Sequence, residues 1–70
     1  LERYESALAR LSASARSAVV SRVELGLNYA QIAEILDKPS ADAARMAVAR
    51  ALVQLAEEME GGGWRSSQHY

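Results

Sequence analysis

Apolar side chains recur at intervals of three and four residues along most of this chain, which is the period of amphipathic helices. The pattern is most complete from 28 to 59, where two segments of unequal length are joined by a short polar turn. Two shorter amphipathic segments precede it, at about 1–10 and 12–25. The pattern predicts an all-α, four-helix domain, and the tight turn between its last two helices predicts a helix-turn-helix.

The third predicted helix begins with several local signals. Asn28 can cap it, and Gln31, three residues later, can return the cap by accepting from the Asn28 backbone. Leu27 and Ile32 flank the cap and can pack together as a hydrophobic staple. The expected apolar face of this helix consists of Ile32, Ile35 and Leu36.

The turn at 37–40 separates the third helix from a longer fourth one. Pro39 disfavours an α conformation at Lys38, so the third helix is expected to stop there, and Ser40 offers a new N-cap. The expected apolar face of the fourth helix consists of Ala44, Val48, Ala51, Leu55 and Met59, while Asp42, Arg45 and Ala49 fall on a different face.

The two N-terminal helices show the same kind of signals. Ser12 or Ser14 can cap the second helix, and Gly26 can end it in the left-handed conformation. The expected apolar faces are Tyr4, Ala7, Leu8 and Leu11 in the first helix, and Ala15, Ala18, Val19 and Val23 in the second.

The last ten residues differ in composition from the rest. Three consecutive glycines, Gly61–Gly63, cannot hold a helix, so 61–70 is expected to be a flexible tail that follows a folded domain at 1–60. Trp64 and His69 lie in this tail, and we expect neither to have a functional role.

Composition narrows the classes of function. The chain has no cysteine, and its one histidine lies in the tail, so we expect neither an enzyme nor a metal site, and no cofactor or small-molecule substrate. No apolar run approaches the roughly 20 residues that span a bilayer, and the lack of cysteine suits a reducing compartment, so we expect no membrane contact and a cytoplasmic location. Because the chain starts at Leu1 and not at a methionine, we also expect a further domain upstream.

Charge gives a mixed indication about nucleic acid. The formal net charge is −1, whereas a free-standing DNA-binding domain usually has a basic excess. The acidic residues Glu57, Glu58 and Glu60 are grouped just before the glycines, however, and the basic residues Arg16, Arg22, Lys38, Arg45 and Arg50 lie in or beside the helix-turn-helix. The local charge near that motif is therefore mildly positive.

An ordered set of positions resembles region 4 of bacterial RNA polymerase sigma factors, most closely those of the extracytoplasmic-function type. The set is Leu11, Arg16, Arg22, Gly26, Leu27, Tyr29, Ile32, Ala33, Leu36, Arg50, Ala51 and Leu55, and the resemblance covers about 4–59. The chain has Ser12 where the family commonly has proline, Gln31 where it has glutamate, and Asp37-Lys38-Pro39 where glycine and an apolar residue are usual. The resemblance implies a four-helix domain that binds the −35 promoter element and the flap tip of the polymerase β subunit.

The resemblance assigns DNA reading to the first two turns of the fourth helix, which a helix-turn-helix inserts into the major groove. The expected base-contacting residues are Ala41, Asp42, Arg45 and Met46. Arg45 can donate to a phosphate or a guanine edge, and Asp42 can accept from a cytosine amino group. The alternative is that Ser40 and Asp42 only cap the helix and that Arg45 is a solvated charge.

A second group of residues is expected to cluster around the start of the third helix and to contact DNA phosphates. It consists of Arg22, Asn28, Tyr29, Gln31 and Lys38. Ser40, at the start of the fourth helix, is also expected to contact a phosphate. The alternative is that Asn28 and Gln31 only cap the helix and that Tyr29 only packs. Arg16 and Arg50 are candidates for ion pairs with Glu24 or Glu34, and we do not expect Arg50 to contact DNA.

The first two helices carry more apolar area than they need to pack against each other. Tyr4, Leu8, Val19, Val20 and Val23 are therefore expected to line a groove for a partner helix, which the resemblance identifies with the polymerase flap. The alternative for each of these residues is an ordinary place in the core.

Three functions remain open at the level of sequence. The leading hypothesis is a promoter-recognition domain that binds DNA and polymerase. The second is a sigma-like interaction module that binds an anti-sigma factor or another regulator without reading DNA. The third is a generic helix-turn-helix repressor domain, for which the chain lacks a recognisable dimerisation element.

Overall fold

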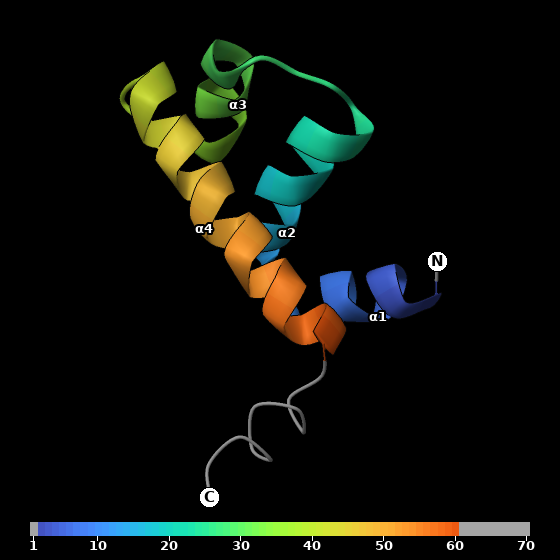
Figure 1. Ribbon diagram of the computed structural model, residues 1–70. Coiled ribbons are helices and arrows are strands. Elements are labelled where there is room, and N and C mark those ends of the chain that lie inside the picture. The colour runs from blue at the N-terminus through green and yellow to red at the C-terminus, as the bar shows by residue number, and fades with distance from the viewer. Residues whose placement is uncertain (1, 61–70) are drawn as a thin grey trace, which may run out of the picture.

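The computed structural model describes residues 2–60, and every regular element among them is helical (Figure 1). The elements in chain order are α1 (Glu2–Arg10), α2 (Ala13–Val19), the short π-helix η1 (Val20–Glu24), α3 (Tyr29–Leu36) and α4 (Ala41–Glu60). The predicted all-α, four-helix class is confirmed. The tail predicted at 61–70, with its glycines, Trp64 and His69, lies outside the described residues.

The long helix α4 is the scaffold of the fold. α3 packs beside its N-terminal end, α1 beside its C-terminal end, and α2 lies between them (Figure 1). The buried core consists of Ala7, Leu11, Ala18, Val19, Ile32, Ala33, Ala44, Val48, Ala51 and Leu55. Half of these side chains are alanine, which lets the helices approach closely but buries little apolar area per residue. The predicted core face of α4 is confirmed, with Met59 half-buried at its end.

The start of α3 has the predicted capping box. The Asn28 side-chain oxygen accepts from the Gln31 backbone at 2.8 Å, and the Gln31 side-chain oxygen accepts from the Asn28 backbone at 3.0 Å. Ile32 is fully buried, but Ile35 is 50% exposed, so its predicted place on the apolar face is wrong. The buried side of α3 is centred between Ile32 and Ala33, and Ile35 lies about 110° around the helix from that centre.

The end of α3 is set by Asp37. This residue has the left-handed conformation, with φ of 59°. The Asp37 and Lys38 amides donate to the carbonyls of Glu34 and Ala33 at 3.4 and 2.8 Å, which is the bonding pattern of a Schellman motif. The left-handed Asp37 thus ends α3 at Leu36, one residue before Lys38, whose backbone is restricted by Pro39. Ser40 caps α4 as predicted, with its hydroxyl accepting from the Ala43 amide at 3.1 Å.

The second predicted helix changes geometry part of the way along. Ser12 caps α2 by accepting from the Ala15 amide at 3.2 Å, and Gly26 has the predicted left-handed conformation, with φ of 66°. Between them, η1 closes with an i→i+5 bond from the Leu25 amide to the Val20 carbonyl at 3.0 Å. The wider turn shifts the register, so Val23 is 55% exposed and Ser21 is buried. The prediction that Val23 lies on the apolar face is wrong for this reason.

Candidate nucleic-acid interface

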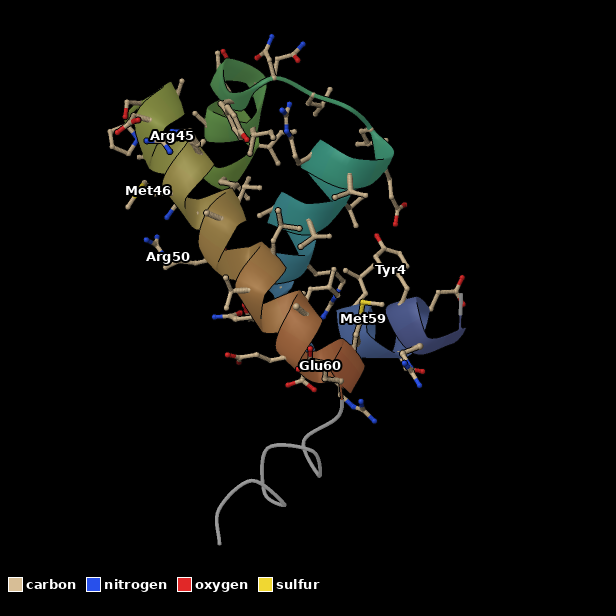
Figure 2. The ribbon with its side chains drawn as sticks, viewed as in Figure 1. Tyr4, Arg45, Met46, Arg50, Met59 and Glu60 are labelled. Carbon is tan, nitrogen blue, oxygen red and sulfur yellow. The ribbon has the colours of Figure 1, made fainter. Side chains whose placement is uncertain are left out.

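The first two turns of α4 form an exposed surface. Ala41, Asp42, Arg45 and Met46 are all exposed there, and Met46 projects outward from the helix (Figure 2). The Ser40 hydroxyl oxygen caps α4 by accepting a hydrogen bond from the Ala43 amide. The O–H of Ser40 can still donate to another group. The four residues predicted to read bases therefore share one accessible surface.

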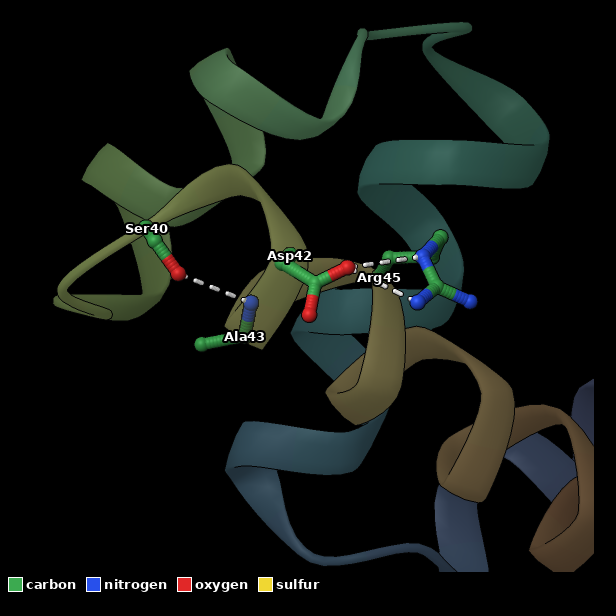
Figure 3. Close-up of polar contacts among 4 residues, drawn as sticks. All are labelled: Ser40, Asp42, Ala43 and Arg45. Carbon is green, nitrogen blue, oxygen red and sulfur yellow. Dashed lines mark hydrogen bonds and ion pairs between the residues drawn. The ribbon is translucent and has the colours of Figure 1, made fainter.

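Arg45 and Asp42 are joined on this surface. The Nε and Nη2 atoms of Arg45 donate to one Asp42 carboxylate oxygen at 3.3 and 2.8 Å (Figure 3). This hydrogen bonding and the negative charge of Asp42 raise the pKa of Arg45, so the guanidinium remains a cation at every physiological pH. Both side chains are more than half exposed, and ion pairs in water contribute little net free energy. The pair can therefore open when a stronger acceptor, such as a phosphate or a guanine edge, approaches.

A second polar cluster lies at the other end of the helix-turn-helix, where the chain enters α3. Arg22 donates to the Leu27 carbonyl at 2.9 Å, and its guanidinium carbon lies 4.5 Å from the centroid of the Tyr29 ring. These contacts hold the segment between η1 and α3 in place. Asn28 and Gln31 use their side-chain oxygens in the capping box, so their amide NH₂ groups remain as exposed donors. The capping role and a role in phosphate binding are compatible at these residues.

Lys38 does not belong to this cluster, and the prediction that placed it there is wrong. It follows the C-terminal end of α3, whereas the cluster lies at the N-terminal end. The helix has eight residues, so the two ends are about 12 Å apart. Lys38 therefore belongs to a different part of the surface from the residues at the start of α3.

Lys38 instead lines a shallow groove between the first turn of α2, the turn before α4 and the middle of α4. We call it the basic groove; its volume is about 170 Å³, and its polar lining residues are Ser12, Ser14, Lys38, Arg50 and Gln54. No carboxylate lines it. Sequence reasoning did not connect Arg50 with Lys38. Helix periodicity places Arg50 about 140° around α4 from Arg45, but it cannot show that the turn and α2 face that side.

A comparison with models of known protein families identifies the family of this chain. The family model described as sigma-70, region 4 matches residues 1–55. The chain belongs to this family. No curated protein and no solved structure matches it significantly. Region 4 domains are non-enzymatic parts of the transcription machinery that interact with DNA and RNA polymerase, and the exposed helix-turn-helix of this region 4 domain agrees with that role.

The predicted partner groove of the region 4 domain is only partly at the surface. Val19 is fully buried, so its assignment to a groove is wrong and it is a core residue. Tyr4, Leu8 and Val20 are half-buried, and Val23 is exposed. Leu25, which the sequence did not suggest, is also exposed, at 62%. Leu25 directly follows η1, so it adds an exposed apolar side chain close in sequence to Val23.

A hydrogen bond crosses this surface between α1 and η1. Tyr4 projects from α1 toward η1, and its hydroxyl donates to a Glu24 carboxylate oxygen at 2.8 Å (Figure 2). The hydrogen bond to Glu24, together with slight burial and the charge of Glu24, raises the pKa of Tyr4. Arg16, a candidate for an ion pair with Glu24 or Glu34, forms neither pair within residues 2–60.

Arg16 connects α2 to the end of α1 through the backbone. It donates to the carbonyls of Leu8 and Leu11 at 3.3 and 3.0 Å. These carbonyls lie at the C-terminal end of α1, where a cation is favoured by the helix dipole. Arg16 is thus a residue that orders the helix junction of the region 4 domain.

Two further results concern metals and membranes. Within residues 2–60, no three histidine, aspartate or glutamate side chains come together in a way that could hold a metal ion. None of the helices in the same range is both long enough and apolar enough to cross a bilayer.

Proposed function

We propose that this region 4 domain recognises the −35 promoter element for a sigma factor of the extracytoplasmic-function type. The observation that carries the proposal is the exposed surface formed by Ala41, Asp42, Arg45 and Met46, at the start of the second helix of a helix-turn-helix. In this arrangement the N-terminal turns of α4 enter the major groove, and α3 crosses the DNA backbone.

The two helices have different tasks in the proposed complex. Arg45 is the one long donor among the base-contacting residues, and Asp42 is the acceptor beside it. Arg22, Asn28, Tyr29 and Gln31 lie at the start of α3, where they orient the domain on the phosphates of the DNA backbone. Specificity in the proposed complex depends on few hydrogen bonds, because Ala41 and Met46 offer only apolar contacts.

Affinity for isolated DNA is expected to be low and strongly dependent on salt. The chain has a formal net charge of −1, so only a few phosphate contacts drive counterion release. Useful affinity would then come from simultaneous binding of polymerase and of another domain of the sigma factor, which raises the effective concentration at the promoter. In this proposal Tyr4, Leu8, Val20 and Val23, with Leu25, contact the β flap through an apolar surface.

The direct test is the substitution Arg45→Ala. Fluorescence anisotropy at low salt measures the affinity of the chain for a −35 duplex and for a scrambled duplex, with and without RNA polymerase. Loss of the Arg45 donor should lower the preference for the −35 duplex about tenfold. The matched control is Arg3→Ala, which removes the same charge from the exposed side of α1. An unchanged preference in the assembled complex would show that Arg45 does not read bases.

The second candidate is a module that binds an anti-sigma factor or another regulator. Two observations favour it: the net charge of −1, and the fact that Arg45 is already engaged by Asp42 in the free domain. If the chain binds no duplex even with polymerase present, but binds a regulator through the same surfaces, this second function replaces the first.

A further inference from the structure

We propose that the basic groove is a binding site for a phosphate group. It lies where three segments meet: Ser12 and Ser14 from the start of α2, Lys38 from the turn before α4, and Arg50 and Gln54 from α4 itself. These residues are far apart in the sequence, and the fold brings their polar groups to one place. Of these residues, only Lys38 is among the predicted phosphate contacts of the helix-turn-helix, so the site as a whole is new.

The two cations of the basic groove have no ionic partner among the residues that the structure describes. Neither the Lys38 ammonium nor the Arg50 guanidinium forms a hydrogen bond or an ion pair with any other residue in the described range 2–60. No carboxylate lines the groove, so its lining residues carry two positive charges and no negative charge. An anion that enters the groove meets favourable charge from two sides.

The remaining lining residues suit an oxyanion. Ser12 accepts a bond from the Ala15 amide, so its O–H is still free to donate, and Ser14 and Gln54 offer a further hydroxyl and an amide NH₂. The rest of the lining consists of alanines, which leave room next to these donors. Guanidinium and ammonium groups with neutral donors around them are the usual ligands of phosphate oxygens.

The size of the groove limits the ligand. Its volume of about 170 Å³ is below the ~300–1,000 Å³ of most small-molecule sites, and the groove is open to solvent. It therefore accepts a phosphate group with its ester oxygens and not a whole cofactor. Two sources share this chemistry: a phosphodiester of the DNA backbone, and free inorganic phosphate or a phosphomonoester.

The position of the groove is compatible with the DNA source. Lys38 and Arg50 lie on the flank of α4 away from Arg45, whereas Arg22 and Tyr29 lie at the start of α3. DNA bound by α4 would then be held on two sides of the recognition helix. This choice of source rests on the proposed function, whereas the phosphate site itself does not.

The first experiment uses inorganic phosphate as the probe. Two-dimensional NMR of the ¹⁵N-labelled chain is recorded during a titration with phosphate, at an ionic strength held constant with chloride. We expect saturable shifts at the amides of Ser14, Lys38 and Gln54, and at least a fivefold weaker response in Lys38→Met and in Arg50→Met. Both substitutions keep an apolar stem in place, and Arg3→Met is the control with the same loss of charge on α1.

The second experiment measures duplex binding as a function of salt. If a DNA phosphate occupies the groove, Lys38→Met and Arg50→Met each reduce the slope of log K against log salt by up to about 0.9, equally for −35 and scrambled duplexes. If both variants lose only the response to inorganic phosphate, the source is a free phosphate. Unchanged salt slopes together with no phosphate-specific shifts in the wild-type chain overturn the proposal. If the wild-type chain binds no DNA, the proposed function fails, and the phosphate titration alone decides whether the groove is a phosphate site.

Discussion

At the scale of single residues, Arg45 and Asp42 act as a pair. Asp42 holds the Arg45 guanidinium along the first turns of α4 through two hydrogen bonds to one oxygen. This exposed pair can open when Arg45 meets a base, whereas the Asp42 carboxylate still repels phosphates nearby. In the proposed complex, Asp42 therefore lowers general affinity for DNA and favours contacts in which Arg45 has a well-placed acceptor.

The substitution Asp42→Asn tests this balance. It removes the negative charge and frees Arg45, so affinity for a scrambled duplex should rise about threefold to tenfold, and the preference for the −35 duplex should fall. Anisotropy titrations at several salt concentrations measure both quantities. The matched control is Glu5→Gln, which neutralises an exposed acid on α1. An equal effect of the two substitutions would show that only net charge matters.

At the scale of elements, the contact between α1 and η1 depends on one polar bridge. α1 packs mainly against α4, and the Tyr4–Glu24 hydrogen bond is the side-chain hydrogen bond that connects it to η1 within residues 2–60. The bridge crosses the apolar surface proposed to bind polymerase.

The substitution Tyr4→Phe removes the bridge and gives a pH-dependent result. Because the folded-state pKa of Tyr4 is raised, the bridge stabilises the fold below pH 10, the usual tyrosine pKa, and this contribution is lost as pH rises through the raised pKa. At pH 7 the variant should lose about 0.5 kcal/mol of stability, the low end for a net hydrogen bond, because the contact is exposed. Above pH 10 the difference should shrink as Tyr4 loses its proton.

Urea denaturation between pH 7 and 11 measures this difference. Tyr29→Phe is the control, because its hydroxyl forms no hydrogen bond within residues 2–60. A loss in Tyr4→Phe that is constant over the whole pH range would contradict the assignment to the Glu24 bridge.

At the scale of the whole molecule, stability is concentrated in few side chains. Half of the buried residues are alanines, and the largest fully buried side chains are Ile32, Val19 and Val48. Each of the larger residues therefore fills a large share of a small core. A domain of this size has a stability of only a few kcal/mol, so the loss of one methylene in the core is a measurable fraction of the total.

A pair of substitutions tests how burial is distributed. Ile32→Val should cost about 1 kcal/mol, because it leaves a small cavity where the α3 face meets the core. Val23→Ala removes more apolar atoms but should cost less than about 0.5 kcal/mol, since Val23 is 55% exposed. Thermal and urea unfolding, followed by circular dichroism, give both values. Equal losses would mean that η1 follows α-helical register and buries Val23 after all.

Much of the fold was predictable because its causes are local. The helix caps and the left-handed turn involve groups no more than four residues apart in the chain. The structure has the Asn28–Gln31 capping box, the Ser40 cap and the left-handed Gly26 where the sequence predicts them. The periodic apolar face of α4 was also predictable, because a long helix averages over local errors. The exposed residues at its start could be named for the same reason.

The errors share a different cause. Periodicity treats every turn as an ideal α-turn, so it could not anticipate η1, where one wider turn exposes Val23. It also says which residues share a face but not what that face meets. For this reason periodicity predicts Ile35 in the core and leaves Val19 open between the groove and the core. Lys38 is a different case, because its place in the turn after the third helix already follows from the sequence.

The sequence by itself determined the helices, their caps, the helix-turn-helix and the family, because these depend on residue type and spacing over a few turns. Only the tertiary structure decided which side chains share a surface. It bridged Tyr4 to Glu24 and brought Lys38 and Arg50 together beside α2. Contacts of this second kind depend on how helices cross, and crossing is set by packing of the whole core and not by any one segment.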